Sequence, residues 1–256
     1  MSKVISMAEA VALVKDGDTV MIGGFMANGA PEKLIDALVA AGTKNLTLIC
    51  NDTGLPGAGA GKMVVSKQFS KIIASHVGLN KETGRQMSAG ETQVELVPQG
   101  TLVEQIRAAG YGLGGVLTAT GIGTLVEEGK QKVTVDGKEY LLEKPLPADV
   151  ALLYAARVDK AGNMQYAGSE NNFNHVMASA AKVTIVEAGE LVEIGELDPN
   201  VVGTPGVFVN YVVAQGATAV PQHGAQAQLA GAQRDSFPRS DGGLGACPHS
   251  DKGGSA

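Results

Sequence analysis

The chain has 256 residues, 44% of them hydrophobic, and a formal net charge of −6 at pH 7. It is long enough to bury one substantial core, and we expect no binding to nucleic acid because no basic stripe is present to neutralise phosphates. The longest apolar stretches have the length of strands and fall short of the roughly 20 residues that span a bilayer, so we expect no association with a membrane.

The first strong signal along the chain is a strand that runs into a pair of glycines. The hydrophobic triplet within Asp18–Ile22 predicts a short buried parallel strand, and Gly23 and Gly24 follow it directly. Without side chains there, backbone amides can approach a ligand or a facing chain. Open α/β sheets bind ligands at the carboxyl ends of their strands, where this turn lies. A close-packed turn without a ligand is the alternative interpretation.

Helices and further strands alternate after this turn. A helix is predicted at Pro31–Ala41, because proline suits the first helical position and Gly42 follows the end. A second helix, Thr101–Ala109, opens with Thr101-x-x-Glu104, the pattern of a capping box. Three apolar segments are typical of strands: Leu46–Cys50, Lys71–His76 and Gln93–Val97.

The second half continues the alternation. Asp136-Gly137 within Val133–Leu142 predicts a hairpin with a type I′ turn, and a helix is predicted through Met177–Ala181. Other strands are predicted at Val150–Arg157, Asn163–Tyr166 and Val183–Val186. The pattern indicates an α/β fold with an open, mainly parallel sheet and helices on both faces, forming a single domain over residues 1–213.

Residues 214–256 differ in composition from the rest. They are rich in Gly, Ala, Gln, Ser and Pro and nearly lack β-branched residues, so they are predicted to form a disordered tail. Cys247 and His249 in this tail are interpreted as a coincidence, because His223 is the only other plausible metal ligand there; we expect no metal and no bound cofactor. Cys50 and Cys247 make no disulfide framework, which favours a cytoplasmic protein with reduced thiols.

Some features look functional but have simpler interpretations. Gly57–Lys62 is not a Walker A loop, because Pro56 and Met63 stand where that motif needs glycine and Ser or Thr. His76, near the end of an apolar strand, is interpreted as a satisfied core histidine. An acidic series is interpreted as a solvated face; it comprises Glu187, Glu190, Glu193 and Glu196.

Gln99 is the main catalytic candidate. It follows a predicted strand and directly precedes the predicted helix at Thr101. A side-chain amide in this position can donate a hydrogen bond to a developing oxyanion, and such donors are worth about 3–4 kcal/mol in acyl transfer. A solvated loop glutamine is the alternative interpretation.

A series of motifs resembles one known family. The first is Asp18–Pro31, which contains an acidic residue, a hydrophobic triplet, Gly-Gly-Phe and Gly-x-Pro. Further motifs follow in order at Leu48–Thr53, Ser75–Gly78, Val97–Leu102, Glu127–Lys130, Asn172–Asn174, Gly195–Pro199 and Thr204–Gly206. From residue 1 to about residue 213 the chain resembles the α subunits of family I coenzyme A transferases, most strongly those that act on acetate, butyrate or acetoacetate.

The resemblance implies a reaction and a partner. It implies a CoA-transferase-like fold and an enzyme that moves CoA from a short-chain acyl-CoA, its substrate, to a carboxylate by a ping-pong mechanism. The nucleophile would be a glutamate in a Ser-Glu-Asn-Gly-like motif on a β subunit, so the chain would act only in a complex, expected to be α2β2. Gln99 would be the oxyanion donor. Contacts with substrate or CoA are expected at Gly23, Gly24, Phe25, Asn51, Asp52 and Gly100.

Glu170 lies in a similar motif within this chain, Ser169-Glu170-Asn171-Asn172. Asn172 replaces the glycine, and the residues that follow have the α-subunit pattern. We therefore interpret Glu170 as a polar loop residue beside the site, and the nucleophile is expected on the partner.

Two other functions compete with this one. The first is a non-catalytic acyl-CoA-binding or sensory protein that has kept the fold; a neighbouring reading frame with Ser-Glu-Asn-Gly would favour the enzyme instead. The second is a sugar-phosphate isomerase, which would need its own acid–base pair and a basic phosphate cradle. Apart from Lys62, the candidate loops lack the cations for that cradle.

Overall fold

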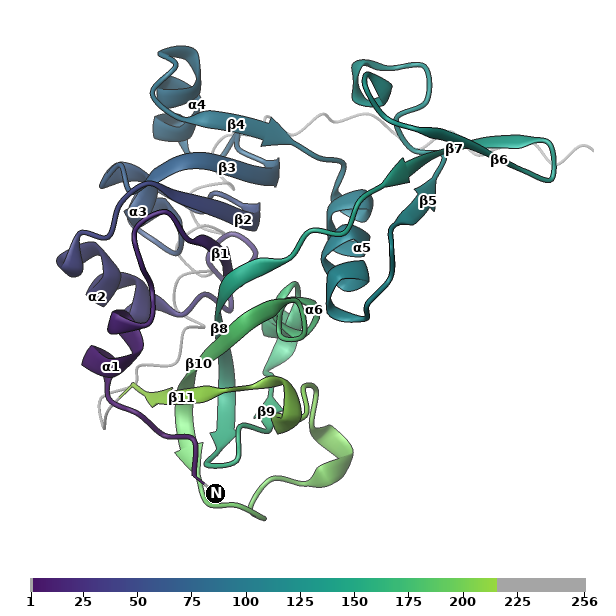
Figure 1. Ribbon diagram of the computed structural model, residues 1–256. Helices are drawn as coiled ribbons and strands as arrows, with labels where there is room; N and C mark the ends of the chain where they lie inside the picture. Colours follow the sequence, from purple (N-terminus) through teal and green to yellow (C-terminus); the bar gives the residue numbers. More distant parts are fainter. Residues whose placement is uncertain (1, 216–256) are drawn as a thin grey trace, which may run out of the picture. The chain divides into compact units, whose positions relative to one another are not determined.

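The computed structural model describes residues 2–215 (Figure 1). The predicted tail lies outside the described residues from position 216 onward, and Cys247 and His249 lie outside them too. Within residues 2–215, no helix is long and apolar enough to cross a membrane.

A mainly parallel sheet forms the centre of the described chain, as predicted (Figure 1). Its strand order is β11-β10-β8-β1-β2-β3-β4, and each neighbouring pair in this order is parallel. The short strand β9 pairs antiparallel with β8. The strands are β1 (Thr19–Ile22), β2 (Leu46–Asp52), β3 (Phe69–His76), β4 (Gln93–Leu96), β8 (Ala148–Asp159), β9 (Met164–Gln165), β10 (Ala181–Val192) and β11 (Tyr211–Ala214).

Helices cover both faces of this sheet, because successive strand residues point to opposite sides. Val20 and Ile22 face one core cluster with Leu34 of helix α2, whereas Met21 faces a second cluster with Ile106 of helix α5. Strands buried on both faces need continuous apolar runs, which is why the triplet in β1 does not alternate. The helices are α1 (Met7–Ala12), α2 (Glu32–Ala41), α3 (Gly61–Val65), α4 (Lys81–Ser88), α5 (Gln99–Gly110) and α6 (Asn174–Met177).

A second, three-stranded antiparallel sheet has the order β5-β7-β6. It consists of β5 (Val116–Thr118), β6 (Lys132–Val135) and β7 (Lys138–Glu143). The predicted hairpin is confirmed: Asp136 and Gly137 have φ angles of 49° and 77°, as a type I′ turn requires. The sequence patterns did not indicate β5, which has only three residues.

Helix α5 begins earlier than predicted, so the predicted capping box is wrong. Pro98 is the N-cap, and the first turn closes when the Leu102 N–H donates to the Pro98 carbonyl oxygen over 2.9 Å. Thr101 therefore lies inside the helix, buried, and its Oγ1 has no hydrogen-bond partner among the described residues. Glu104 pairs with Arg107 instead. As a consequence, Gln99 belongs to the first helical turn and does not precede the helix.

The predicted helix at Met177–Ala181 is also displaced. Helix α6 ends at Met177, and strand β10 already begins at Ala181. The alanines of this segment favour a helix locally. Pairing of β10 with β8, which runs from Ala181 opposite Ala148 to Val192 opposite Asp159, overrides that preference.

The acidic series divides into two environments. Glu190, Glu193 and Glu196 are exposed, as predicted, and Glu190 pairs with Arg157 at 2.9 Å. For Glu187 the prediction of a solvated face is wrong, because its side chain is fully buried. Its Oε2 accepts the backbone N–H of Leu34 in the first turn of α2 over 2.7 Å, and its Oε1 accepts from Gln215 Nε2. A carboxylate at a helix N-terminus is favoured by the helix dipole.

Glu187 should make stability depend on pH. Burial raises the pKa of Glu187 above its ordinary value, although hydrogen bonds from Gln215 and the α2 backbone oppose this. The folded state then binds more protons than the unfolded chain between the unfolded pKa, about 4.3, and the raised folded value. The free energy of unfolding contributed by Glu187 should therefore fall as pH rises through this window.

The Glu187→Gln variant has no proton to lose and should lack this decline. Urea unfolding of both proteins from about pH 4 to about pH 8 measures the difference. We expect the stability of the variant relative to wild type to increase with pH and then to level off. Parallel pH profiles would contradict a raised pKa at Glu187.

Candidate active site

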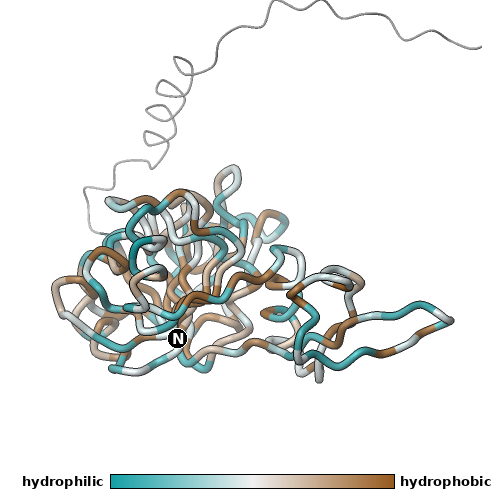
Figure 2. Tube along the Cα trace, turned by 90° about the horizontal axis from the view of Figure 1, so that it is seen from above, coloured by the Kyte–Doolittle hydropathy of each residue, from teal (hydrophilic) through white to brown (hydrophobic). Residues whose placement is uncertain are grey.

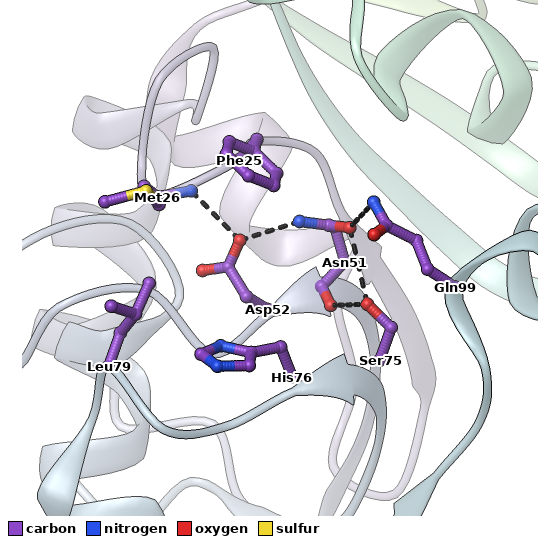
Figure 3. A pocket seen from close by; sticks show the side chains of 8 residues that line it. All are labelled: Phe25, Met26, Asn51, Asp52, Ser75, His76, Leu79 and Gln99. Atoms are coloured by element: carbon purple, nitrogen blue, oxygen red, sulfur yellow. Dashed lines mark hydrogen bonds between the residues drawn. The ribbon is translucent and has the colours of Figure 1, made fainter. Parts of the chain in front are cut away.

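A pocket of about 350 Å³ opens at the carboxyl ends of strands β2 and β3 (Figure 3). Strand β2 is longer than predicted and ends with Asn51 and Asp52, and β3 ends with Ser75 and His76. The N-terminus of α5, the turn after β1 and the turn after β3 contribute the rest. The lining residues are Phe25, Met26, Asn51, Asp52, Ser75, His76, Leu79 and Gln99.

The Asp52 carboxylate is held by hydrogen bonds on both oxygens. Oδ2 accepts from the Met26 backbone N–H over 2.9 Å and from Asn51 Nδ2 over 2.8 Å, and Oδ1 accepts from the Gly54 N–H over 2.8 Å. Its side chain is also buried. A carboxylate whose lone pairs are shared among three donors is a poor nucleophile. Asp52 thus joins the turn after β1 to the end of β2.

Gln99 reaches the pocket from the first turn of α5. Its Nε2 donates to Asn51 Oδ1 over 2.8 Å (Figure 3). Asn51 is buried. Ser75 Oγ supports the same residue by donating to the Asn51 carbonyl oxygen over 2.7 Å. A primary amide has two N–H groups, and this bond uses one of them. The other N–H of Gln99 can donate to a bound oxygen atom.

His76 is exposed and lines the pocket, so the predicted core histidine is wrong. The parallel register places it directly opposite Asp52 on the neighbouring strand. Phe25, Met26 and Leu79 add an apolar wall, and Phe25 is 46% exposed. His76, Met26, Ser75 and Leu79 were not predicted from the sequence as part of the site. The signal that could have found His76 is its place at a strand end, beside another strand that ends in polar residues.

The turn that carries Phe25 has a strained backbone. Phe25 and Asn28 exchange two backbone hydrogen bonds of 2.9 and 3.0 Å around Met26 and Ala27, whose φ angles are 50° and 66°. This two-residue turn needs positive φ at both central positions, which glycine and asparagine usually supply. Each such non-glycine residue costs of order 1–3 kcal/mol and persists only where surrounding contacts enforce it.

Those contacts come from Asn172, which lies just before α6, and from Asn174, the first residue of α6. Asn172 Oδ1 accepts the Gly24 N–H over 3.2 Å, and its Nδ2 donates to the Asn28 carbonyl oxygen over 3.0 Å. Asn174 Nδ2 donates to the Gly29 carbonyl oxygen over 2.9 Å. The two asparagines therefore hold both ends of the strained turn. In the sequence, the two asparagines are recognisable only as part of the motif Asn172–Asn174.

The glycine pair is explained by packing within the chain. A Cβ atom on Gly23 would lie 1.9 Å from Asn174 Oδ1. The Gly23 N–H donates to the Leu152 carbonyl oxygen over 3.0 Å, and the Gly24 N–H is taken by Asn172. Neither amide is free to donate to a ligand, so the structure favours the close-packed turn. Both glycines line a smaller recess that Asp52 also borders.

Three other candidates lie apart from the main pocket. Gly100 is exposed on α5 and is not among the lining residues, although it follows Gln99 directly. Glu170 is buried in the short 3-10 helix Gly168–Asn171, and its Oε2 accepts the Ala167 N–H over 2.8 Å. Lys62 pairs with Glu32 and Asp36, each at 2.6 Å, and therefore offers no free cation to a phosphate.

Thiol and metal chemistry gain no support from the part of the chain that the structure describes. Cys50 precedes Asn51 but is buried, and burial, aided by the charge of Asp52, raises the pKa of its thiol well above the usual value. A thiol in that state is not a nucleophile. Within residues 2–215, no group of three or more His, Cys, Asp or Glu side chains is placed to hold a metal ion.

Comparison with known proteins assigns the family. The profile of the coenzyme A transferase family matches residues 4–215. This chain belongs to the coenzyme A transferase family. The resemblance of the sequence motifs is thereby confirmed.

Two curated members of the coenzyme A transferase family match this chain over almost their whole length. The alpha subunit of the acetate CoA-transferase of Escherichia coli (strain K12) is 51% identical over 212 residues, which cover 83% of this chain and 96% of that protein. The alpha subunit of the acetoacetyl-CoA:acetate/butyrate CoA transferase of Clostridium acetobutylicum is 53% identical over 216 residues, covering 84% and 99%.

Solved structures of transferases share the fold. The thioester complex with CoA of an acyl-CoA transferase from Escherichia coli O157:H7 superposes with a TM-score of 0.74 at 23% identity. The alignment covers 84% of this chain and 47% of that one, so the chain spans about half the length of that transferase.

Proposed function

We propose that this chain is the α subunit of a heteromeric coenzyme A transferase that moves CoA between a short-chain acyl-CoA and acetate, butyrate or acetoacetate. The observation that carries the proposal is the identity of 51–53% over nearly the whole length of two α subunits named for these substrates. The pocket fits such substrates, because Phe25, Met26 and Leu79 suit a short alkyl chain while Asn51 and Gln99 suit a thioester or carboxylate oxygen.

In the proposed reaction, a glutamate that the β subunit provides attacks the acyl thioester carbonyl carbon. The C–S bond breaks, giving an acyl-glutamyl anhydride and CoA thiolate. The thiolate then attacks the glutamyl carbonyl carbon, which releases the first carboxylate and leaves a glutamyl-CoA thioester. The acceptor carboxylate reverses these steps, so each activated acyl group is exchanged for another and no ATP is needed.

This chain would supply a wall of the site and a hydrogen-bond donor. The N–H of Gln99 that does not bind Asn51 would donate to the oxygen on which negative charge develops. Phe25, Asn51 and Asp52 are proposed as substrate contacts, with Asp52 also holding the turn after β1. Gly100 is proposed to contact CoA through its backbone amide, since the first N–H groups of a helix lack partners within it. Gly23 and Gly24 would shape the turn.

The proposal has three further parts. The domain that acts spans residues 1–213, the complex is α2β2, and it works in the cytoplasm. The curated relatives are named as alpha subunits, which supports a partner chain. The shielded carboxylate of Asp52 and the buried carboxylate of Glu170 support a nucleophile supplied by that partner.

The isolated chain should have no transferase activity. We would measure exchange of CoA from acetyl-CoA to butyrate with the pure chain, with the pure β subunit, and with both together. Only the mixture should show exchange. Substantial exchange by the pure chain would contradict a nucleophile on the partner, and an inactive complex that still binds acyl-CoA would favour a non-catalytic binding protein. The Glu170→Gln variant serves as a control: it should keep activity in the complex if Glu170 is only structural.

A further inference from the structure

The small sheet has two faces of opposite character. Residues paired across strands point to the same face, and so do residues two apart along a strand. The register pairs Leu117 with Leu142 and Val133 with Tyr140. One face therefore carries five apolar residues, which we call the apolar face: Leu117, Val133, Val135, Tyr140 and Leu142. Lys138 lies at its end, with its Nζ 5.3 Å from the centre of the Tyr140 ring.

The opposite face is closed by the chain itself. Leu141 on that face is fully buried, and its Cδ1 would lie 3.4 Å from a Cβ atom on Gly121, in the loop that leads from β5 to β6. Glu143, on the same face, is buried too and pairs with Lys130 of this loop at 2.6 Å. The side chains farther along this face, Thr134 and Glu139, are polar and exposed.

Within residues 2–215, the apolar face has no such cover. Leu117 and Val135 are 43% and 42% exposed, and the other three residues are only partly buried. Tyr111 and Leu113, in the connection from α5, add exposed apolar surface next to β5. Figure 2 shows the small sheet extending outward, with hydrophobic and hydrophilic segments along its strands. Contiguous exposed apolar surface of this kind marks an interaction site in a soluble protein.

The apolar face is fixed in position relative to the pocket through helix α5. Gln99, the first residue of α5, lines the pocket, and the other end of α5 leads through Tyr111 to β5. The Leu146 N–H, just after β7, donates to the Gln105 carbonyl oxygen over 3.0 Å, and Gln105 Nε2 donates to Glu143 Oε2 over 3.1 Å. A partner chain that delivers a glutamate to the pocket beside Gln99 would therefore also meet the small sheet.

We propose that the apolar face is a docking surface for an apolar surface of the β subunit. This inference rests on the proposed function, because it identifies the occupant with the chain that brings the nucleophile. Docking there would bury the apolar face and hold the partner along α5, so that its glutamate is placed against the pocket at Gln99. A second copy of this chain would cover the apolar face but would bring no nucleophile.

The test uses the full chain mixed with the β subunit, and measures the dissociation constant of the complex by sedimentation. Two variants place a charge on the apolar face, Leu117→Lys and Val135→Lys. Thr134→Lys is the matched control, because it adds the same charge to the neighbouring residue on the opposite face. We expect each apolar-face variant to raise the dissociation constant about 30-fold or more, and Thr134→Lys to change it less than about 3-fold. Circular dichroism and thermal unfolding of each isolated variant show whether it is folded. If a lysine variant does not fold, Val135→Thr is measured in its place.

Failure of the docking surface and failure of the proposed function give different results. If the wild-type complex forms and is active, and neither substitution changes its dissociation constant, the apolar face is not the partner site, while the proposed function stands. If the substitutions abolish self-association of this chain but not the complex with the β subunit, the occupant is a second copy and the inference is wrong. If wild-type chains form no complex at all, the proposed function fails together with the inference.

Discussion

Replacing Gln99 by alanine should lower kcat of the reconstituted complex about 10²-fold and leave KM for acyl-CoA near the wild-type value. An oxyanion donor acts mainly in the transition state, where the acyl oxygen carries its greatest negative charge. Gln99 is suited to this because Asn51 Oδ1 accepts one of its N–H groups at 2.8 Å and so orients the amide, while the second N–H stays available. Steady-state exchange kinetics measure both constants.

Two companion variants sharpen this test. Gln99→Glu should be worse than Gln99→Ala, because a carboxylate repels the developing charge, donates nothing and faces the acceptor oxygen of Asn51. If Asn51 acts through Gln99, the double variant Gln99→Ala/Asn51→Ala should have a kcat only slightly lower than that of Gln99→Ala alone. A rise in KM with kcat preserved would instead indicate that Gln99 binds the ground state, and the oxyanion role would be abandoned.

The architecture could be predicted because strands buried on both faces leave a local signature. The triplet Val20-Met21-Ile22 is apolar without alternation since Val20 and Ile22 face one core and Met21 the other. The hairpin turn was equally local, since Asp136-Gly137 alone specifies two positive φ angles. Gln99 was a candidate because of its position after a predicted strand, whereas Asn51 and Asp52 were expected from the family resemblance; all three line the pocket.

The parts that could not be predicted depend on contacts between distant residues. The sequence around Glu187 resembles that around its exposed neighbours. Its carboxylate can be buried because it accepts the N–H of Leu34, 153 residues away. His76 was assigned to the core because its strand is apolar, whereas its exposure depends on where β3 ends relative to β2. Thr101-x-x-Glu104 matched a capping box, but Pro98 starts the helix earlier. Local patterns in a single sequence do not show which distant residues are in contact.

Gly23 also depends on a distant residue, because its place in the fold is limited by Asn174. Substitution of Gly23 should therefore have a large effect on stability. Replacing Gly23 by alanine would put a Cβ atom 1.9 Å from Asn174 Oδ1 and 2.6 Å from its Cγ, so the buried Asn174 side chain would have to move. That movement breaks its bonds to the carbonyl oxygens of Gly29 and Glu170 and to the N–H of Tyr154. Since each buried polar group left without a partner costs about 1–3 kcal/mol, we expect a loss of about 3–5 kcal/mol in the free energy of unfolding.

A double-mutant cycle distinguishes this contact from a general intolerance at position 23. Asn174→Ala removes the obstructing amide, so Gly23→Ala should cost at least about 2 kcal/mol less in the Asn174→Ala protein than in wild type. Gly84→Ala is the matched control, because no atom of residues 2–215 apart from its neighbours in helix α4 lies within 4 Å of its Cβ position, and it should stabilise the protein by about 0.4–1 kcal/mol. Urea unfolding measures all four proteins of the cycle and the control. Additive costs of Gly23→Ala and Asn174→Ala would show that the glycine is required for another reason, and the ligand-approach interpretation of the Gly23-Gly24 turn would then be reopened.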